Sequence, residues 1–358
     1  MIKNPISISK RAKLNLFRSY RKVQTQLHDL TYLFWECTLR CNLNCLHCGS
    51  DCLSKNSQPD MPLKDFLKVL DEVKSQYEPS KVLIAITGGE PLLRNDLEKC
   101  GVEIQKRGFP WGMVSNGFTL TNEKYDSFVK AGLKTLTISL DGLEENHNWL
   151  RNHKDSFKKA VDAISYIAQK NNIIFDIVTC VNRKNINELE KIKELLISLK
   201  VKQWRLFTIF PKGRAKDIKE FNLNGGELKR VMEFIVNTRK ENHIKVEFSC
   251  EGFTGNYEMN VRDGVFFCRA GINVASVLAD GSISACPSLR GDYIQGNIYK
   301  DKFLDIWNEK FEIMRDRNWT KTGECKSCKA YKWCEGNGLH LRDELTGKLL
   351  YCHYNKLY

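Results

Sequence analysis

Three cysteines within eight residues, Cys41, Cys45 and Cys48, constrain this chain more than any other feature. The gaps of three and then two residues place three thiols on one tight loop, directly after the apolar run at 32–35. Thiolates are the soft ligands that iron–sulfur clusters select, and a four-iron cluster has four ligand positions. Three protein ligands therefore leave one iron open to a ligand that is not protein. The alternative is a zinc knuckle, but such sites usually pair two Cys-x2-Cys units or add histidines, and His47 is wedged between two of the cysteines.

Strand-like and helix-like segments alternate through the first two thirds of the chain. Apolar, β-prone runs occur at 32–39, 82–87, 112–115, 135–140, 173–181 and 204–210. Helical periodicity occurs at 62–77, 95–107, 122–131, 156–171, 186–199 and 225–241. Repeated strand–helix units predict a parallel sheet with right-handed crossovers. Six units rather than eight predict an α/β fold with a partial (β/α)6 TIM-type barrel.

Polar and glycine-rich motifs stand at the ends of these strands, which is where α/β barrels carry their chemistry. The residues concerned are Gly88, Gly89, Glu90, Ser115, Asn116, Ser139, Asp141, Arg151 and Gly213. Glycines let a ligand approach the backbone closely. The planar fork of an arginine can bind a carboxylate through two parallel hydrogen bonds. Taken one at a time, each motif is also compatible with an ordinary turn or a surface charge.

The strand–helix rhythm ends near residue 244, and the chain becomes rich in cysteine. A hairpin with an Asp-Gly turn is predicted at 274–285. The cysteines of this region are Cys268 and Cys286 beside the hairpin, then Cys325, Cys328 and Cys334, and finally Cys352. The chain has 14 cysteines and no secretory signal, so the clustered thiols indicate metal binding in a reducing compartment, the cytoplasm.

The cysteine loop and the strand-end motifs together resemble those of the radical S-adenosylmethionine (SAM) enzymes. The resemblance implies that Cys41, Cys45 and Cys48 hold a catalytic [4Fe–4S] cluster whose open iron chelates SAM. An electron from the cluster would cleave SAM to methionine and a 5′-deoxyadenosyl radical, which abstracts hydrogen from the substrate. The resemblance also implies SAM contacts by His47, beside the adenine, and by Gly88, Gly89, Glu90, Ser115, Asn116, Ser139, Asp141, Arg151 and Gly213.

The C-terminal cysteines resemble the SPASM extension of peptide-modifying and sulfatase-maturing radical SAM enzymes. The resemblance implies a small cysteine-rich α+β domain, with one auxiliary iron–sulfur cluster held by Cys325, Cys328, Cys334 and Cys352. Cys268 and Cys286 would serve another auxiliary cluster. However, Gly338 and Val274 stand where family members carry further ligands, and Cys250 is only a speculative third. We expect one or two auxiliary clusters: a complete one, and another site that is open, differently ligated or empty.

These observations divide the chain into a basic N-terminal helix at 1–30, a radical SAM barrel at 31–243 and a SPASM domain at 244–358. The net charge is +13, and the first acidic residue is Asp29. A basic helix of this kind could contact nucleic acid, an acidic peptide or a membrane surface, but it is more often a solvated face. No zinc finger, RNP aromatic motif or helix-turn-helix pattern accompanies it. No apolar stretch approaches the ~20 residues of a membrane span. We therefore expect neither nucleic-acid binding nor a membrane span.

The resemblance implies a radical SAM oxidoreductase or maturase that modifies a peptide or protein side chain by crosslinking or oxidation. Its expected partners are that substrate and an electron donor such as flavodoxin or ferredoxin. Sulfatase maturation is not expected, because Pro287 follows Cys286 where those enzymes carry an Asp general base. Two alternatives stay open. One is chemistry on a small molecule such as a tetrapyrrole, and the other is a non-catalytic iron–sulfur scaffold or electron carrier.

Overall fold

A ten-stranded sheet organises the computed structural model, which describes residues 6–53, 57–249 and 251–358. The strand order is β10-β9-β8-β1-β2-β3-β4-β5-β6-β7, and β1 to β7 are all parallel to their neighbours. These seven strands are β1 (Tyr32–Thr38), β2 (Leu83–Gly88), β3 (Trp111–Ser115), β4 (Leu133–Ser139), β5 (Ile174–Val181), β6 (Gln203–Thr208) and β7 (Lys245–Phe248).

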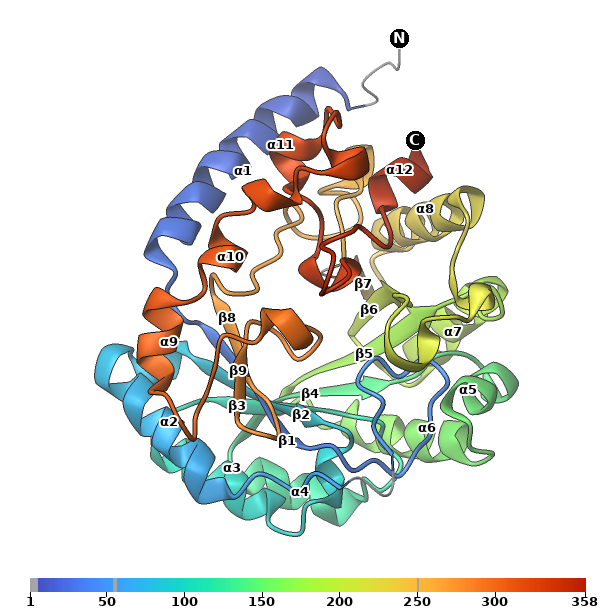
Figure 1. The fold of residues 1–358 in the computed structure, drawn as a ribbon. Helices are drawn as coiled ribbons and strands as arrows, with labels where there is room; N and C mark the ends of the chain where they lie inside the picture. The colour runs from blue at the N-terminus through green and yellow to red at the C-terminus, as the bar shows by residue number, and fades with distance from the viewer. Residues whose placement is uncertain (1–5, 54–56, 250) are drawn as a thin grey trace.

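Helices cover the outer face of the curved sheet (Figure 1). They are α2 (Leu63–Gln76), α3 (Leu97–Lys106), α4 (Asn122–Lys130), α5 (Glu144–Arg151), α6 (Ser156–Ile167), α7 (Leu189–Ser198) and α8 (Gly225–Glu241). The helices pack on the sheet through apolar residues spaced along one face. In α2 the buried residues are Phe66, Val69, Leu70 and Val73. Trp35 of β1 stacks on Phe66, with ring centroids 4.4 Å apart. Burying each such side chain contributes about 1.5–3 kcal/mol.

The predicted partial barrel is confirmed, since all six predicted strand–helix units are present in one parallel sheet. The structure adds β7, which pairs with β6 and lies after the point where we expected the alternation of strands and helices to end. It also adds α5, whose buried residues are His147, Leu150 and Arg151. Both elements lack a strong apolar signal, because β7 has only four residues and α5 buries mainly polar side chains.

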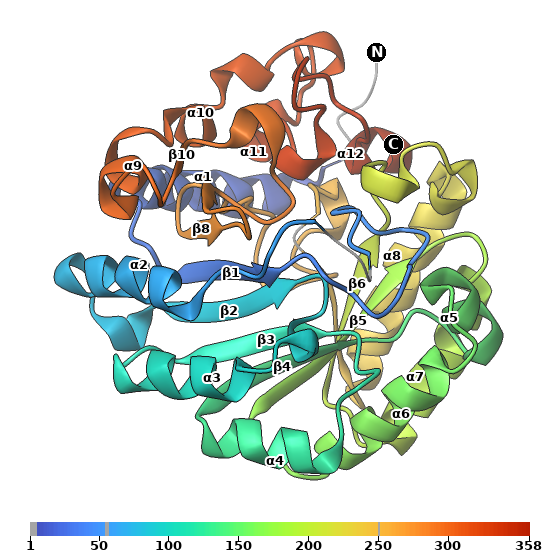
Figure 2. The same cartoon turned by 60° about the horizontal axis from the view of Figure 1, so that its bottom comes forward.

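The C-terminal region extends the barrel sheet beyond β1. β8 (Val274–Val277) pairs in parallel with β1, and β9 (Ser282–Ser284) and β10 (Gly296–Asn297) continue the sheet in antiparallel fashion. The predicted hairpin is thus confirmed. In Figures 1 and 2 the orange and red C-terminal segments fill the gap in the ring of helices between α2 and α8. The boundary at 243 stays a prediction, and the sheet continues across it.

Short helices and the N-terminal helix complete this side of the molecule. They are α9 (Phe303–Glu309), α10 (Glu312–Arg315), α11 (Tyr331–Cys334), α12 (His353–Leu357) and α1 (Ile8–Leu27). The basic helix α1 is fastened to α11, because Arg21 donates to the backbone oxygen of Trp333 at 2.6 Å. The indole of Trp333 in turn donates to Asn15 at 2.9 Å. Within the described ranges, none of the helices is both long enough and apolar enough to cross a membrane.

Candidate active site

The cysteine loop follows β1 at the carboxyl edge of the parallel strands. Its backbone is tied to two other segments: Cys41 N donates to Leu53 O at 3.0 Å, and Leu46 N donates to Leu150 O at 2.9 Å. Cys41 and Cys45 are buried, and the apolar side chains of the loop pack around them. The protein alone therefore fixes the loop on which the predicted ligands lie.

The thiols of this loop are more widely spread than the ligands of a single metal ion. Among the described residues, one group of three offers ligand atoms within 4.8 Å of one another, and it is His47, Asp141 and Cys180 rather than the loop cysteines. In that group the charge of Asp141 is already balanced by Arg151, whose Nε lies 2.6 Å from Oδ2. We assign no metal ion there.

The turn after β6 packs closely against the cysteine loop. Gly213 has φ +54°, and a Cβ at this position would lie 2.4 Å from the backbone oxygen of Cys48. The next residue, Arg214, donates from its backbone to Cys48 O at 3.0 Å and from Nε to Cys45 O at 2.8 Å. Only a glycine allows this approach, because any Cβ would overlap the loop carbonyl. The sequence singled out Gly213 but not Arg214.

The glycine pair Gly88–Gly89, at the end of β2, lies directly against the end of β1. Gly89 N donates to Thr38 O and Glu90 N donates to Arg40 O, both at 2.8 Å. A Cβ on Gly88 would lie 2.1 Å from Thr38 O, and one on Gly89 would lie 2.2 Å from Arg40 O. The pair thus extends the β1–β2 pairing into the loop that carries the cysteines. Its predicted contact with SAM stays a prediction.

Glu90 holds the ends of β2 and β3 together. Its carboxylate is 1 % exposed and accepts from Ser115 Oγ at 2.9 Å, from Asn116 N at 2.7 Å and from Leu92 N at 3.1 Å. Burial raises the pKa of this carboxyl, although the three hydrogen bonds oppose the rise. Asn116 continues toward the cysteines, with Nδ2 3.9 Å from Cys41 Sγ. The structure therefore brings Glu90, Ser115 and Asn116 to the cysteine loop as one connected unit.

Asp141 and Arg151 form an ion pair next to the cysteine loop. The guanidinium of Arg151 reaches Cys45 Sγ at 3.7 Å while it pairs with Asp141. The other oxygen of Asp141 accepts from Cys180 N at 2.8 Å. Burial acts to raise the pKa of Asp141, but the guanidinium of Arg151, the neighbouring histidines and the Cys180 N–H together outweigh it, and the pKa is lowered. The pair is thus ionised and places a cation beside one predicted cluster ligand.

His47 lies next to this pair. Burial lowers its pKa to about 4, so the imidazole is neutral at physiological pH. Its Nδ1 is buried and has no hydrogen-bond partner within the described residues. Ser139, the last residue of β4, is also buried. The predicted position of His47 beside the adenine and the predicted SAM contact of Ser139 stay predictions.

The electrostatic surroundings of the loop suit an anionic cluster. Burial raises the pKa of Cys41, to about 12, and that of Cys45. The pKa of Cys48 is lowered to about 5 by a hydrogen bond from the Cys52 thiol. Metal ligation deprotonates thiols, and the guanidinium of Arg151 stabilises the resulting negative charge. The residues present therefore fit a [4Fe–4S] cluster with three protein ligands.

Four C-terminal cysteines line one small cavity together with residues of α11 and α12. They are Cys325, Cys328, Cys334 and Cys352. Two hydrogen bonds point at their sulfurs: Arg342 Nη2 lies 3.3 Å from Cys325 Sγ, and Asn355 N lies 3.5 Å from Cys352 Sγ. A shared cavity with four thiols and N–H donors fits a complete auxiliary iron–sulfur cluster.

The other predicted auxiliary site is less complete. A Cβ on Gly338 would lie 2.7 Å from the backbone oxygen of Glu251 and 2.7 Å from the ring of His340, so the backbone here leaves no room for a cysteine. Val274 is buried within β8. Cys250 lies outside the described residues. Cys268 and Cys286 are free, half-buried thiols, and their joint role at this site stays a prediction.

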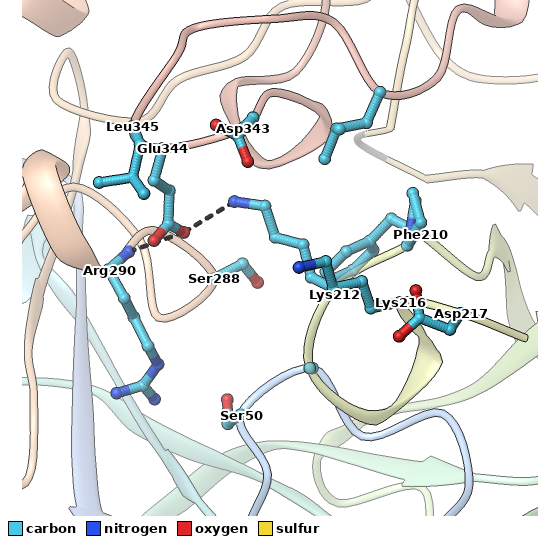
Figure 3. A pocket seen from close by; sticks show the side chains of 14 residues that line it. Ser50, Phe210, Lys212, Lys216, Asp217, Ser288, Arg290, Asp343, Glu344 and Leu345 are labelled. Atoms are coloured by element: carbon cyan, nitrogen blue, oxygen red, sulfur yellow. Dashed lines mark hydrogen bonds and ion pairs between the residues drawn. The ribbon is translucent and has the colours of Figure 1, made fainter.

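A cleft of about 560 Å³ opens between the cysteine loop and the C-terminal region (Figure 3). It begins at Gly49 and Ser50, directly after Cys48. Its charged lining residues are Lys212, Lys216, Asp217, Arg290, Asp343 and Glu344. Lys212 pairs with Glu344 at 2.7 Å, and both are drawn facing each other across the cleft. Sequence reasoning missed this cleft, because its walls come from four separate segments of the chain, at 49–50, 210–217, 288–290 and 343–350.

Family profiles match both halves of this arrangement. The radical SAM superfamily profile matches residues 35–196, and the SPASM iron–sulfur cluster-binding domain profile matches residues 268–329. The chain belongs to the radical SAM superfamily. It is therefore an enzyme of the class that uses a [4Fe–4S] cluster and SAM, and its SPASM domain is of the kind that binds auxiliary iron–sulfur clusters. The predicted classes of cofactor are confirmed.

Individual relatives differ in what they act on. The chain is 28% identical over 328 residues to an AdoMet-dependent heme synthase of Methanosarcina barkeri, covering 84% of this chain and 89% of that protein. It is 25% identical over 308 residues to the mycofactocin maturase MftC of Mycolicibacterium smegmatis, covering 85% and 76%. The structure of anSMEcpe with bound AdoMet and Cp18Cys peptide has a TM-score of 0.71 at 20% identity, covering 92% of this chain and 94% of that chain. That likeness shows a shared fold.

Proposed function

We propose that this radical SAM enzyme modifies a side chain of a peptide or protein, by oxidation or by a crosslink. The position of the cleft beside the cysteine loop is the observation that supports this proposal. Because it starts at Gly49 and Ser50, one residue beyond Cys48, a substrate in it lies beside the site of radical formation.

The charges of the cleft suit a peptide better than a polyanionic small molecule. Its lining offers as many carboxylates as cations, and two of the three cations are already paired. Lys212 binds Glu344, and Arg290 forms an ion pair with the buried Glu36 of β1. A ligand with several carboxylates needs a surplus of positive charge, because desolvated like charges repel. A balanced lining can instead serve the polar backbone and mixed side chains of a peptide.

The rim of the cleft adds apolar surface. Leu345 is 80% exposed and Leu350 is 37% exposed, and both line the cleft. Exposed apolar residues at the edge of a cleft are typical of a site that receives a partner. We therefore assign this rim to side chains of the substrate that flank the modified residue.

Each predicted site residue has a proposed role in holding the cofactors. When bound, the cluster and SAM supply the 5′-deoxyadenosyl radical. Cys41, Cys45 and Cys48 are the proposed ligands, and Arg214 fixes their loop through backbone oxygens. The remaining proposed SAM contacts are His47, Gly88, Gly89, Glu90, Ser115, Asn116, Ser139, Asp141, Arg151 and Gly213. An electron donor such as flavodoxin or ferredoxin completes the proposal.

The proposal is tested with reconstituted protein, dithionite, SAM and a pool of synthetic peptides of mixed sequence. We expect 5′-deoxyadenosine together with a peptide that has lost hydrogens, both absent from the Cys41/Cys45/Cys48→Ala variant. Leu345→Ser should raise the KM for that peptide several-fold and leave kcat nearly unchanged, because it removes rim contact and touches no cluster ligand. Leu16→Ser is the matched control, since Leu16 is 75% exposed on the distant helix α1. Equal effects of the two substitutions would contradict the assignment of the rim.

A second candidate is chemistry on a carboxylated tetrapyrrole. The observation in its favour is the similarity to the AdoMet-dependent heme synthase over 84% of the chain. In this case Lys212 and Arg290 would have to exchange their partners Glu344 and Glu36 for the carboxylates of the substrate. An iron porphyrin with propionate groups, added in place of the peptides, separates the candidates. Loss of carbon dioxide from the porphyrin would establish this function and overturn the peptide proposal.

A further inference from the structure

Arg342 is a fully buried arginine that touches a proposed cluster ligand. It is 1% exposed and lies in the turn after α11. Its Nη2 donates to Cys325 Sγ at 3.3 Å and to Thr320 O at 3.1 Å. Its Nε donates to Gly336 O at 2.9 Å, and Nη1 donates to Gly347 O at 2.8 Å. Every nitrogen is occupied, so the guanidinium is held in one position.

We propose that Arg342 raises the reduction potential of the auxiliary cluster held by Cys325, Cys328, Cys334 and Cys352. It is a positioning residue that acts through the Cys325 sulfur rather than by touching the substrate. The proposal rests on a cluster being bound at these four cysteines, but it does not depend on which substrate the enzyme uses.

The physical basis is charge. Reduction adds one negative charge to the cluster, and a nearby cation stabilises the reduced form more than the oxidised form. An N–H donor aimed at a ligand sulfur acts in the same direction. Burial strengthens both effects, because the surrounding dielectric is low. No carboxylate compensates the charge of the Arg342 guanidinium within the described ranges, because its partners are three carbonyl oxygens and a sulfur.

The cysteine loop offers a contrast within the same molecule. There Arg151 reaches Cys45 Sγ at 3.7 Å, a longer contact, and Asp141 neutralises its charge at 2.6 Å. The C-terminal site therefore has the closer donor and the uncompensated cation. Asp343 and Glu344, the residues that follow Arg342, line the substrate cleft. A readily reduced cluster at this place is suited to exchange electrons with a bound substrate.

The test uses the Cys41/Cys45/Cys48→Ala protein, so that the auxiliary cluster gives the spectroscopic signal. Its midpoint potential is measured by anaerobic redox titration, with the electron paramagnetic resonance of the reduced cluster as readout. We expect the midpoint potential to be highest in the protein that keeps Arg342, lower in Arg342→Lys and lowest in Arg342→Gln. Lysine keeps the charge but loses the planar fork, and glutamine loses both. For Arg342→Gln we expect at least a tenfold change in the reduction equilibrium, about 59 mV for a one-electron couple.

Arg317 provides a matched control. It is 6% exposed and donates to the backbone oxygens of Met314, at 2.9 Å, and Cys268, at 2.9 Å, with no hydrogen bond to the four cysteines in the described structure. Arg317→Gln should shift the potential much less than Arg342→Gln. An unchanged potential in an iron-replete Arg342→Gln protein, or an equal shift in Arg317→Gln, would overturn the proposal. If Arg342→Gln does not retain iron, Arg342→Lys decides, and an unchanged potential there overturns it as well. Failure of the peptide proposal would leave these potentials untouched.

Discussion

Asp141 and Arg151 show how much a single buried pair can matter at this site. Asp141 is wholly buried, and each of its oxygens has a partner. Removing one member of a buried ion pair leaves an uncompensated charge and costs about 3–5 kcal/mol. We therefore expect Arg151→Met to lower the free energy of unfolding of the cluster-free protein by this amount in urea. The double variant Asp141→Asn/Arg151→Met should be more stable than Arg151→Met, because the buried charge is gone. A double variant as unstable as the single one would refute this account.

The same pair sets a pH dependence. The pKa of Asp141 is lowered in the folded protein, so the pair contributes its full stability above the ordinary aspartate pKa, about 3.9. That contribution is lost as the pH falls through the lowered folded pKa. Asp141→Asn should therefore show a smaller loss of stability on acidification below about pH 4. Urea titrations at a series of pH values measure the difference.

At the residue scale, sequence reasoning could find the cysteines and glycines but not their supports. A cysteine triple or a glycine pair has a recognisable spacing within a few positions. Arg214 contacts the cysteine loop, which lies far away in the chain, and Arg342 reaches Cys325 only through the fold of the C-terminal region, so nothing in their local sequence reveals these contacts. The same holds for Ser115 and Glu90: each was singled out, but their mutual hydrogen bond depends on how β2 and β3 lie side by side.

At the element scale, the turn after β6 packs against the cysteine loop and is hydrogen-bonded to it. We expect Gly213→Ala to lower iron incorporation at the loop, because the added Cβ would lie 2.4 Å from Cys48 O. Gly264→Ala is the control: its φ is +88°, but nothing lies within 4 Å of the added Cβ. Both substitutions carry the dihedral penalty of an L residue in the left-handed region, on the order of 1 kcal/mol. Iron analysis and the charge-transfer absorbance of the purified proteins then isolate the steric effect. Similar iron contents in the two variants would contradict it.

Elements with strong periodicity could be predicted, and weakly patterned ones could not. The six strand–helix units have apolar runs or amphipathic faces, and the structure contains each of them. By contrast, α5 buries His147 and Arg151, which serve the site rather than the core, so its sequence lacks an apolar stripe. β7 becomes a strand because β6 offers it a parallel edge. Its formation is a tertiary effect, which local propensity does not contain.

At the scale of the whole molecule, the two predicted domains share one sheet and one core. β8 pairs with β1 although about 240 residues separate them, and a single cluster of buried side chains includes Trp35 of the barrel and Trp307 of the C-terminal region. Arg290 adds an ion pair to Glu36 of β1. Sequence reasoning predicted a barrel followed by a separate cysteine-rich domain, because each half has its own local pattern. The pairing that joins them is invisible to local patterns.

The number of clusters is the property of the whole molecule that the structure makes most testable. Cys325, Cys328, Cys334 and Cys352 share one cavity, whereas the position of Gly338 leaves no room for a cysteine. We therefore expect about eight irons per reconstituted chain, because each [4Fe–4S] cluster holds four.

The variants locate those irons. The Cys41/Cys45/Cys48→Ala protein and the Cys352→Ser protein should each retain about four irons, since each loses a different cluster. Cys268→Ser should retain about eight, because its site lacks a full set of ligands. Parallel iron and sulfide analysis of these proteins gives the answer. About twelve irons in the wild type, with a loss of about four in Cys268→Ser, would show a second auxiliary cluster and a ligand other than residue 338.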